Sequence, residues 1–598
     1  MLYRADADGG NVIRLSANYL TDFTPSVMRD GRILFSRWEY VDRPAIPIQS
    51  LWAVNPDGTM LSGVFGNRVL SPATFMEARD IPGRPGKILC VMTSHNGPCR
   101  GAIGLIDPDL GGNAQEAIRN LTPEITIGTV EDAGRGNAMR GLYESPVPLD
   151  ELHYLVSRAG TILLRDYEGT AEMILCEPRN GMGFYSAQPL RPRTLPRLMP
   201  VSRIAADAEP VAELLMHDVN IGLGDAVKRG EIKRIAVVQE MEKDIRSETT
   251  QRQFGFQFPV VSCGATYAPK RVWGFAEVEK DGSAHFKVPA NMPLYFLPLD
   301  AEGRAVQRMR TFTHFMPGER QSCIGCHADR NYVSSGALRT GPSIAAARPA
   351  EELTAPDWGS RDGFSFTRVV QPVLDAHCVR CHDGEAEPDL SGDRTDYFNV
   401  AYENLARRGT QAEHGGDARG GMKGFGRNPY TSWIPTFNGC ESNILEIKPK
   451  TWGSPASPLA DLVINGHPDG KGVKRIELNA AERQRILMWI DLNVPYYGTS
   501  QSRQPGLRGC RRIVPENLDA VLDDISKRRG FDLPRTFYIR LDNPEKNPFL
   551  SVPLARGDFA STEDSDYQRI LTCFKDVPAA LEQRIDVDYR TVIQACGD

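Results

Sequence analysis

Two short motifs carry the strongest chemical signal in the sequence. Each has two cysteines separated by two residues and a histidine directly after the second cysteine: Cys323-Ile-Gly-Cys326-His327 and Cys378-Val-Arg-Cys381-His382. Two thiols one helical turn apart can form thioethers with the two vinyl groups of a porphyrin, and the adjacent imidazole then reaches the iron. The spacing therefore predicts two covalently bound haems of the c type, named haem 1 and haem 2 in chain order. The alternative is zinc, although zinc fingers do not ordinarily place His directly after the second Cys of both pairs.

Haem 2 needs a second axial ligand. His467 lies 85 residues after His382, shortly before a predicted helix, where a cytochrome chain returns to the distal face of its haem. Met422 is the main rival, but it lies in a glycine-rich stretch, where a ligand is harder to hold rigidly. We expect His467 to be the ligand, and two imidazoles would make haem 2 a low-potential electron carrier.

Two predicted helices would position the second motif. Pro372 can begin a short helix that presents Cys378. Asn479 with Glu482 three residues later forms a capping box, and the helix that follows has an apolar face made by Ile486, Leu487, Trp489 and Ile490. A haem motif on one helix and a later amphipathic helix are the minimum of a cytochrome c fold. Residues 359–500 are therefore predicted to be a cytochrome c-like domain.

Residues 1–195 repeat an apolar segment followed by an acidic turn. The acidic residues recur at intervals of 49, 50 and 59 residues, at Asp8, Asp57, Asp107 and Asp166. A second strand type fills the intervals, at residues 30–37, 86–91 and 152–158. This pattern predicts four-stranded propeller blades, and a chain that begins inside a repeat agrees with a propeller that is incomplete at its N-terminus. An ordinary β-sandwich with coincidental turns is the alternative.

Residues 196–338 read as a further β domain that ends in the first haem motif. Ala284, Phe286 and Val288 alternate with polar residues, and the apolar run 294–299 leads into a turn. Residues 339–358 form the expected linker. The C-terminal extension, 501–598, has no assignable fold. The predicted fold class is therefore mainly β: an N-terminal propeller, a further β unit, and an α-helical cytochrome c-like domain.

Composition excludes several other functions. The 598 residues include 70 basic and 76 acidic side chains, and a net charge of −6 offers no field for gripping phosphate backbones, so no nucleic-acid partner is expected. No apolar run approaches the roughly 18 residues that a transmembrane span needs. Covalent haem attachment occurs outside the cytoplasm, so we expect a periplasmic or other extracytoplasmic protein. The N-terminus has no secretory signal pattern, so either the signal peptide was lost upstream or the chain is a fragment.

Four segments resemble the hydrazine synthase alpha subunit and its homologues. They are Phe35–Arg43, Asp281–Phe286, Pro317–Ser322 before the first haem motif, and Trp489–Gly498. The likeness runs from residue 1 to about residue 500 and keeps the order of propeller, β unit, first haem and second haem. It implies redox chemistry on a small nitrogen compound, and a redox partner protein or other subunits of a complex as partners.

The resemblance also implies that the two haems differ. In the synthase subunit a tyrosine shortly after one motif binds the iron, while the motif histidine and a distant cysteine bind zinc. Here Tyr332 follows His327 by five residues, and Cys99 is the candidate for the distant cysteine. An anionic tyrosinate would favour five-coordinate ferric iron, which makes Tyr332 the candidate catalytic residue. The alternatives are that His327 binds the iron while Tyr332 only packs, and that Cys99 is buried or forms a disulfide, with Cys90 as a candidate partner.

Three functions remain open from the sequence. In the first, haem 1 is the reaction centre for a small nitrogen compound and haem 2 supplies electrons. In the second, both irons are six-coordinate and the chain is an electron-transfer or docking protein. In the third, an open haem paired with a closed one acts as a dihaem peroxidase. The ligands of haem 1 distinguish the three functions, and nothing in the sequence names the substrate.

Overall fold

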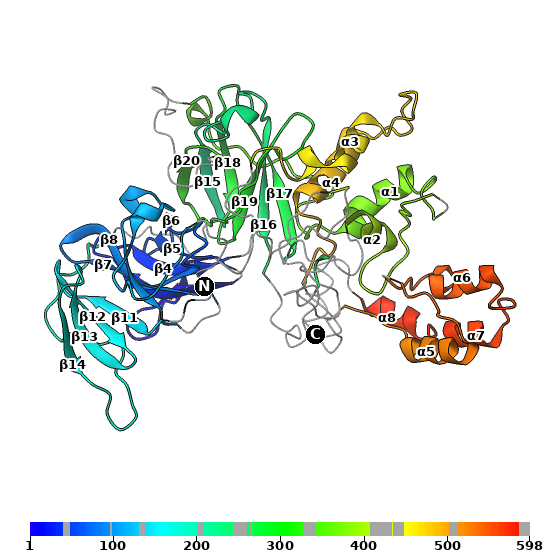
Figure 1. Cartoon of the computed structure of the whole chain (residues 1–598). Coiled ribbons are helices and arrows are strands. Elements are labelled where there is room, and N and C mark those ends of the chain that lie inside the picture. Colours follow the sequence, from blue (N-terminus) through cyan, green and yellow to red (C-terminus); the bar gives the residue numbers. More distant parts are fainter. Residues whose placement is uncertain are drawn as a thin grey trace.

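The computed structural model places strands in the first part of the chain and α-helices in the last. It describes residues 1–18, 20–39, 48–95, 99–130, 139, 141–199, 209–242, 260–263, 266, 268–326, 343–384, 386–406, 433–434, 448–500, 511–536 and 538–584. In these residues the strands end at residue 323 and the α-helices begin at residue 371 (Figure 1). The prediction of a strand-rich N-terminal part and a helical C-terminal region is confirmed.

Strands β3 to β14 form three successive antiparallel meanders of four strands each. The first two meanders join in one sheet through the parallel pairing of Gln49 with Thr74, and the third is a separate sheet. A short hairpin of β1 and β2 precedes them. The strands are β1 (Tyr3–Arg4), β2 (Ile13–Arg14), β3 (Thr21–Val27), β4 (Ile33–Trp38), β5 (Gln49–Val54), β6 (Ser62–Phe65), β7 (Thr74–Ile81), β8 (Arg84–Thr93), β9 (Ala102–Ile106), β10 (Ile118–Asn120), β11 (Tyr143–Pro148), β12 (His153–Arg158), β13 (Thr161–Asp166) and β14 (Glu172–Cys176).

The repeated aspartates all close turns. In each meander the aspartate lies where the third strand gives way to the fourth, and in the first hairpin it lies between β1 and β2. Each carboxylate accepts a hydrogen bond from a backbone N–H further along its own turn, at 2.9 to 3.3 Å. The pairs are Asp8 and Gly10, Asp57 and Thr59, Asp107 and Asp109, and Asp166 and Thr170. The sequence repeat therefore reflects a turn that aspartate stabilises through its own side chain.

Two three-stranded sheets follow, and they share one apolar core (Figure 1). Their strands are β15 (Val211–Met216), β16 (Arg234–Glu240), β17 (Lys270–Glu277), β18 (Ala284–Pro289), β19 (Leu294–Leu299) and β20 (Arg320–Cys323). The strands predicted at residues 284–288 and 294–299 correspond to β18 and β19. The sheet orders are β18-β15-β20 and β17-β16-β19.

The sheet of β17, β16 and β19 is buried on both faces. Ile235 and Val237 pack into the core shared with β18, whereas Ala236 and Val238 pack into a second core with the helices α1, α2 and α4. Because successive side chains of a strand point to opposite faces, β16, like its neighbours β17 and β19, packs against both the β unit and the helical region.

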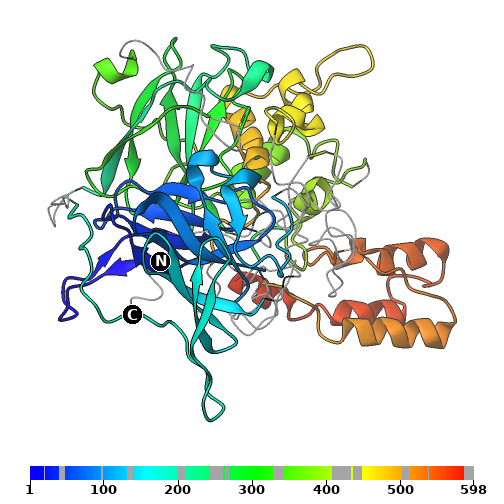
Figure 2. The same cartoon turned by 60° about the vertical axis from the view of Figure 1, so that its left-hand side comes forward.

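In the described residues four α-helices follow the β unit, and four more form a C-terminal module with its own core. In Figures 1 and 2 this module, defined as the described residues of 511–584, stands apart from the sheets. The predicted capping box of Asn479 and Glu482 begins α4. The helices are α1 (Gln371–His377), α2 (Val400–Ala406), α3 (Pro458–Asn465), α4 (Ala480–Asp491), α5 (Leu518–Arg529), α6 (Pro548–Arg556), α7 (Ser565–Thr572) and α8 (Val577–Gln583). Among the described helices, none has the length and apolar character that crossing a bilayer requires.

Candidate functional site

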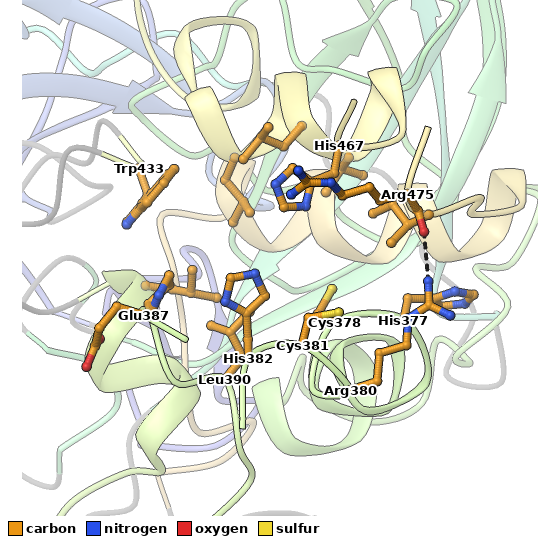
Figure 3. Close-up of a pocket in the computed structure, with 16 residues that line it drawn as sticks. His377, Cys378, Arg380, Cys381, His382, Glu387, Leu390, Trp433, His467 and Arg475 are labelled. Atoms are coloured by element: carbon orange, nitrogen blue, oxygen red, sulfur yellow. Dashed lines mark hydrogen bonds between the residues drawn. The ribbon is translucent and has the colours of Figure 1, made fainter. Parts of the chain in front are cut away.

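A cavity of about 250 Å³ lies between the second haem motif and α3 (Figure 3). Cys378, Cys381 and His382 line it on one side and His467 lines it on the other. The structure thus brings together the four residues that the sequence predicts for haem 2. The rest of the wall is mainly apolar, with Pro388, Leu390, Leu405, Trp433, Leu459, Leu462, Val463 and Ile476.

The second motif continues the helical path of α1 beyond its end. The Cys378 N–H donates to the carbonyl of Leu374 at 2.7 Å, and the His382 N–H donates to the carbonyl of Cys378 at 3.1 Å. Helical backbone places residues three and four apart on one face. Cys378, Cys381 and His382 therefore open into the same cavity.

The backbone turn at the end of α3 brings His467 into the cavity. Gly466 and His467 both have left-handed backbone conformations, with φ of 79° and 47°. The N–H groups of both residues donate to the Leu462 carbonyl, which closes the helix end. Left-handed backbone at a residue other than glycine costs on the order of 1–3 kcal/mol and is concentrated at functional sites. This turn directs the imidazole of His467 towards His382.

The two imidazoles are spaced as two ligands of one metal ion would be. The ring centres of His382 and His467 lie 6.2 Å apart, and the ring planes differ by 23°. With metal–nitrogen bonds of about 2 Å and ring centres about 1 Å beyond each nitrogen, two imidazoles on opposite sides of one metal ion have centres about 6 Å apart. Within the described part of the chain, the buried Nδ1 of His382 has no hydrogen-bond partner. The donor set, spacing and apolar wall therefore fit a covalently bound haem.

Electrostatics keep His467 suited to metal binding. Burial lowers its pKa, and the neighbouring Arg475 and His382 lower it further. The neutral imidazole, which is the form that binds metals, is thus favoured. Burial also raises the pKa of the Cys378 thiol to about 11. His377 instead pairs with Glu482, at 3.0 Å between Nε2 and Oε1, as a helix-end residue would.

Some lining residues carry no sequence signal. Arg475 and Trp433 line the cavity, and the Arg380 guanidinium donates to the Arg475 carbonyl at 2.7 Å. They come from separate segments and share no spacing with the motif. The hairpin that returns Arg475 to Gly466 through a backbone hydrogen bond could not be read from composition.

The first motif lies at the end of β20. Cys323 pairs across to Met216 of β15, and Cys323 and Cys326 are half-buried against the sandwich core. Burial raises the pKa of Cys323 to about 11 and that of Cys326 to about 12. Between them, a Cβ on Gly325 would lie 2.6 Å from the Asp218 carbonyl oxygen, so only glycine fits there. His327 and Tyr332 lie outside the described residues, as does Met422.

The comparisons with known proteins bear on this part of the chain. Residues 230–328 match the family model of the hydrazine synthase alpha subunit middle domain. The chain is hydrazine synthase alpha subunit-like. The matched segment includes β16 to β20 and both cysteines of the first motif, whereas the cavity at His382 lies after it.

Two matches to this hydrazine synthase alpha subunit-like chain come from Kuenenia stuttgartiensis. Its hydrazine synthase subunit alpha is 24% identical over 223 residues, which is 28% of this chain and 27% of that relative. Less than a third of the relative's length is therefore matched. The structure of K. stuttgartiensis hydrazine synthase is similar with a TM-score of 0.54 at 18% identity, and the match covers 81% of this chain and 70% of that chain. At this identity the likeness shows a shared fold.

The candidate zinc residue Cys99 is exposed. Cys90 is buried, and both thiols are free, so the alternative that Cys99 is buried or bonded to Cys90 is wrong. The part of the chain that the structure describes contains no group of three His, Cys, Asp or Glu side chains that could hold a metal ion. His327, the other candidate zinc ligand, is not in that part.

Proposed function

We propose that this chain is an extracytoplasmic dihaem c-type cytochrome related to the hydrazine synthase alpha subunit. The observation that carries the proposal is the 6.2 Å separation of the His382 and His467 ring centres in a cavity also lined by Cys378 and Cys381. Two thiols and two opposed imidazoles are the protein groups that a six-coordinate haem c requires. Attachment of haem c outside the cytoplasm supports a periplasmic or other extracytoplasmic location.

The residues of the cavity have distinct roles in the proposed site. Cys378 and Cys381 would hold the porphyrin by thioether bonds, while His382 and His467 would hold the iron from its two faces. Leu390, Leu405, Val463 and the other apolar residues of the wall would exclude water from a bound haem. A haem with two imidazole ligands supplies one-electron transfer at low potential.

The proposed reaction centre is haem 1. Cys323 and Cys326 would attach it, and Tyr332 or His327 would bind its iron, with a small nitrogen compound as the substrate class. Support for this role comes from the match of residues 230–328 to the hydrazine synthase alpha subunit middle domain, which contains both cysteines. An exposed thiol at Cys99 leaves that side chain available for zinc, with His327 as the partner ligand when Tyr332 binds the iron.

The proposal also gives the N-terminal sheets a role. We infer that the three four-stranded meanders are blades of a β-propeller, because each repeats the same strand order and the same aspartate turn. The curated relative is named as a subunit, which supports a partner role with other subunits or with a redox protein. The propeller would then serve as the platform for such a partner.

A non-catalytic electron-transfer cytochrome is the second candidate. The cavity supports electron transfer at haem 2 under both candidates, because His382 and His467 would both bind its iron, so the two candidates differ at haem 1. Under this alternative haem 1 is also six-coordinate, and the chain passes electrons without substrate chemistry.

Intact mass and haem staining test the proposal. The chain should be expressed with export from the cytoplasm in a host that has the haem-attachment machinery. The product is then run on a denaturing gel stained for haem, and its intact mass is measured. We expect a mass increase of two haems. A mass increase of one haem would show that only one of the two motifs binds haem. No increase in mass would contradict the proposal.

A further inference from the structure

One wall of the cavity is formed by the segment that follows the second motif. Glu387, Pro388 and Leu390 line the cavity, and Asp389 lies between them with its side chain buried. The wall is tied to the motif itself, because the Leu390 N–H donates to the His382 carbonyl at 2.8 Å. The Leu390 carbonyl accepts from the Gln371 side chain of α1 at 3.1 Å. Any movement of Leu390 therefore disturbs the backbone of His382.

The C-terminal module holds the same wall from outside. Arg540 forms an ion pair with Asp389, in which the side chains are 12% and 4% exposed. The second guanidinium nitrogen of Arg540 reaches Asp393 at 3.3 Å. Arg540 is itself held in place, because Asn547 accepts from its backbone N–H and donates to its carbonyl, at 2.9 and 3.0 Å. Asn547 thus fixes the backbone of Arg540, from which the guanidinium extends to the wall.

Backbone contacts on both sides of Arg540 extend this attachment. Leu541 donates to the Arg394 carbonyl at 2.8 Å, and the Asp396 N–H donates to the Ile539 carbonyl at 3.0 Å. Asp542 also pairs with the Arg394 guanidinium at 2.6 Å. Residues 539–542 of the module therefore pair with the segment 394–396 almost as a neighbouring strand would. The Arg540 side chain extends beyond this segment to Asp389.

We propose that Arg540 is a positioning residue that lets the C-terminal module set the cavity wall beside His382. The role of the wall in shielding haem 2 rests on the proposed function, but its attachment to the module does not. Loss of the Arg540 guanidinium leaves a buried carboxylate at Asp389 without its charged partner, which favours movement of the wall towards solvent. Water that enters the cavity stabilises the more positively charged ferric state and lowers the reduction potential.

The test compares Arg540→Gln with Arg540→Lys and with the control Arg535→Gln in the full-length protein. Arg535 belongs to the same module but pairs with the exposed Asp519 and Asp523, and none of these three residues lines the cavity. Amide hydrogen exchange of residues 386–399, and above all of the Leu390 N–H, reports the wall directly. The reduction potential and visible spectrum of haem 2 report its effect on the site.

We expect Arg540→Gln to speed exchange at Leu390 at least tenfold and to shift the potential of haem 2 to a more negative value. Arg540→Lys should restore part of both effects, and Arg535→Gln should leave both unchanged. Unchanged exchange at 386–399 in Arg540→Gln would overturn the proposal. If the chain carries no haem 2 but exchange at Leu390 still rises, the proposed function fails and the positioning role stands.

Asp389→Asn provides a second variant that removes the same ion pair from the other side. It should accelerate exchange in the same segment as Arg540→Gln. If both variants accelerate exchange throughout the C-terminal module rather than at the wall, Arg540 serves the folding of the module and the positioning role is wrong.

Discussion

The imidazoles of His382 and His467 face one another with their ring centres 6.2 Å apart, although 85 residues separate them in the sequence. The first follows α1 and the second follows α3, and both helices pack into the core that also contains α4. The backbone turns at the two helix ends therefore set the spacing.

Replacement of His467 tests whether this spacing serves an iron. His467→Ala should convert a low-spin spectrum of haem 2 to a high-spin one and raise its reduction potential, because the second imidazole favours the ferric state. Visible and electron paramagnetic resonance spectra check the spin state.

A matched control is His377→Ala. His377 also lines the cavity, but its ring pairs with Glu482. This variant should keep the low-spin spectrum. A low-spin spectrum in both variants would redirect attention to Met422 as the axial ligand.

The two haem sites should be separable by mutation. Cys378→Ala with Cys381→Ala should remove one haem mass and the low-spin signal while haem 1 stays in place. The reason is that the first motif ends β20 in the sandwich, whereas the second follows α1 in the helical region. Intact mass of this double variant, and of the corresponding Cys323 and Cys326 double variant, checks the assignment. Loss of both haems from either double variant would contradict independent attachment.

Tyr332 and Cys99 decide between enzyme and electron carrier. If Tyr332 binds the iron of haem 1, the ferric protein should be high-spin with a phenolate charge-transfer band, and Tyr332→Phe should abolish that band. His327 would then be free for a second metal, so about one equivalent of zinc should be present and should be lost in Cys99→Ala. Metal analysis and absorption spectra measure both. A low-spin haem 1 that fails to bind carbon monoxide would favour the carrier.

Local patterns in the sequence predicted well both the turns of the N-terminal strands and the elements near the candidate site. Asn479 and Glu482 form the capping box, and the aspartate turns occur at the four expected places, because both features depend on residues at most four apart. The side chains of Cys378, Cys381 and His382 lie within about one helical turn, so their shared face could also be predicted from spacing. His467 could be predicted to lie in the same cavity because a six-coordinate haem iron needs a second axial ligand, which in a cytochrome chain comes after the motif.

Other parts of the site depend on contacts between distant segments. Arg540 meets Asp389 across 151 residues, and Asp389 shows no distinguishing pattern in the sequence. The four helices of the C-terminal module bury their apolar residues against one another, so short helical segments gave no fold from periodicity alone. Both features follow from tertiary packing between distant segments, which local patterns in a single sequence do not reveal.

A buried carboxylate in α4 joins the helical region to the β unit. Asp491 is fully buried, and its oxygens accept from the Ser454 N–H and hydroxyl at 2.7 Å and from the Ala305 N–H at 2.9 Å. Burial raises the pKa of Asp491 to about 7, and these hydrogen bonds only partly oppose that effect. The folded protein therefore holds the Asp491 proton over a range of pH in which the unfolded chain releases it.

This proton gives a defined pH dependence of stability. Between about pH 4 and pH 7 the folded state binds more protons at Asp491 than the unfolded state does, so the free energy of unfolding falls as the pH rises through this window and levels off above it. Each unit of the pKa shift corresponds to about 1.4 kcal/mol. Asp491→Asn removes this contribution, while the lost acceptor oxygen lowers stability at every pH. Urea unfolding at pH 4.5, 5.5, 6.5 and 7.5 should therefore show the wild-type advantage over the variant shrinking by a few kcal/mol as the pH rises. Curves that run parallel for the two proteins would mean that Asp491 is already ionised in the folded state at pH 4.5.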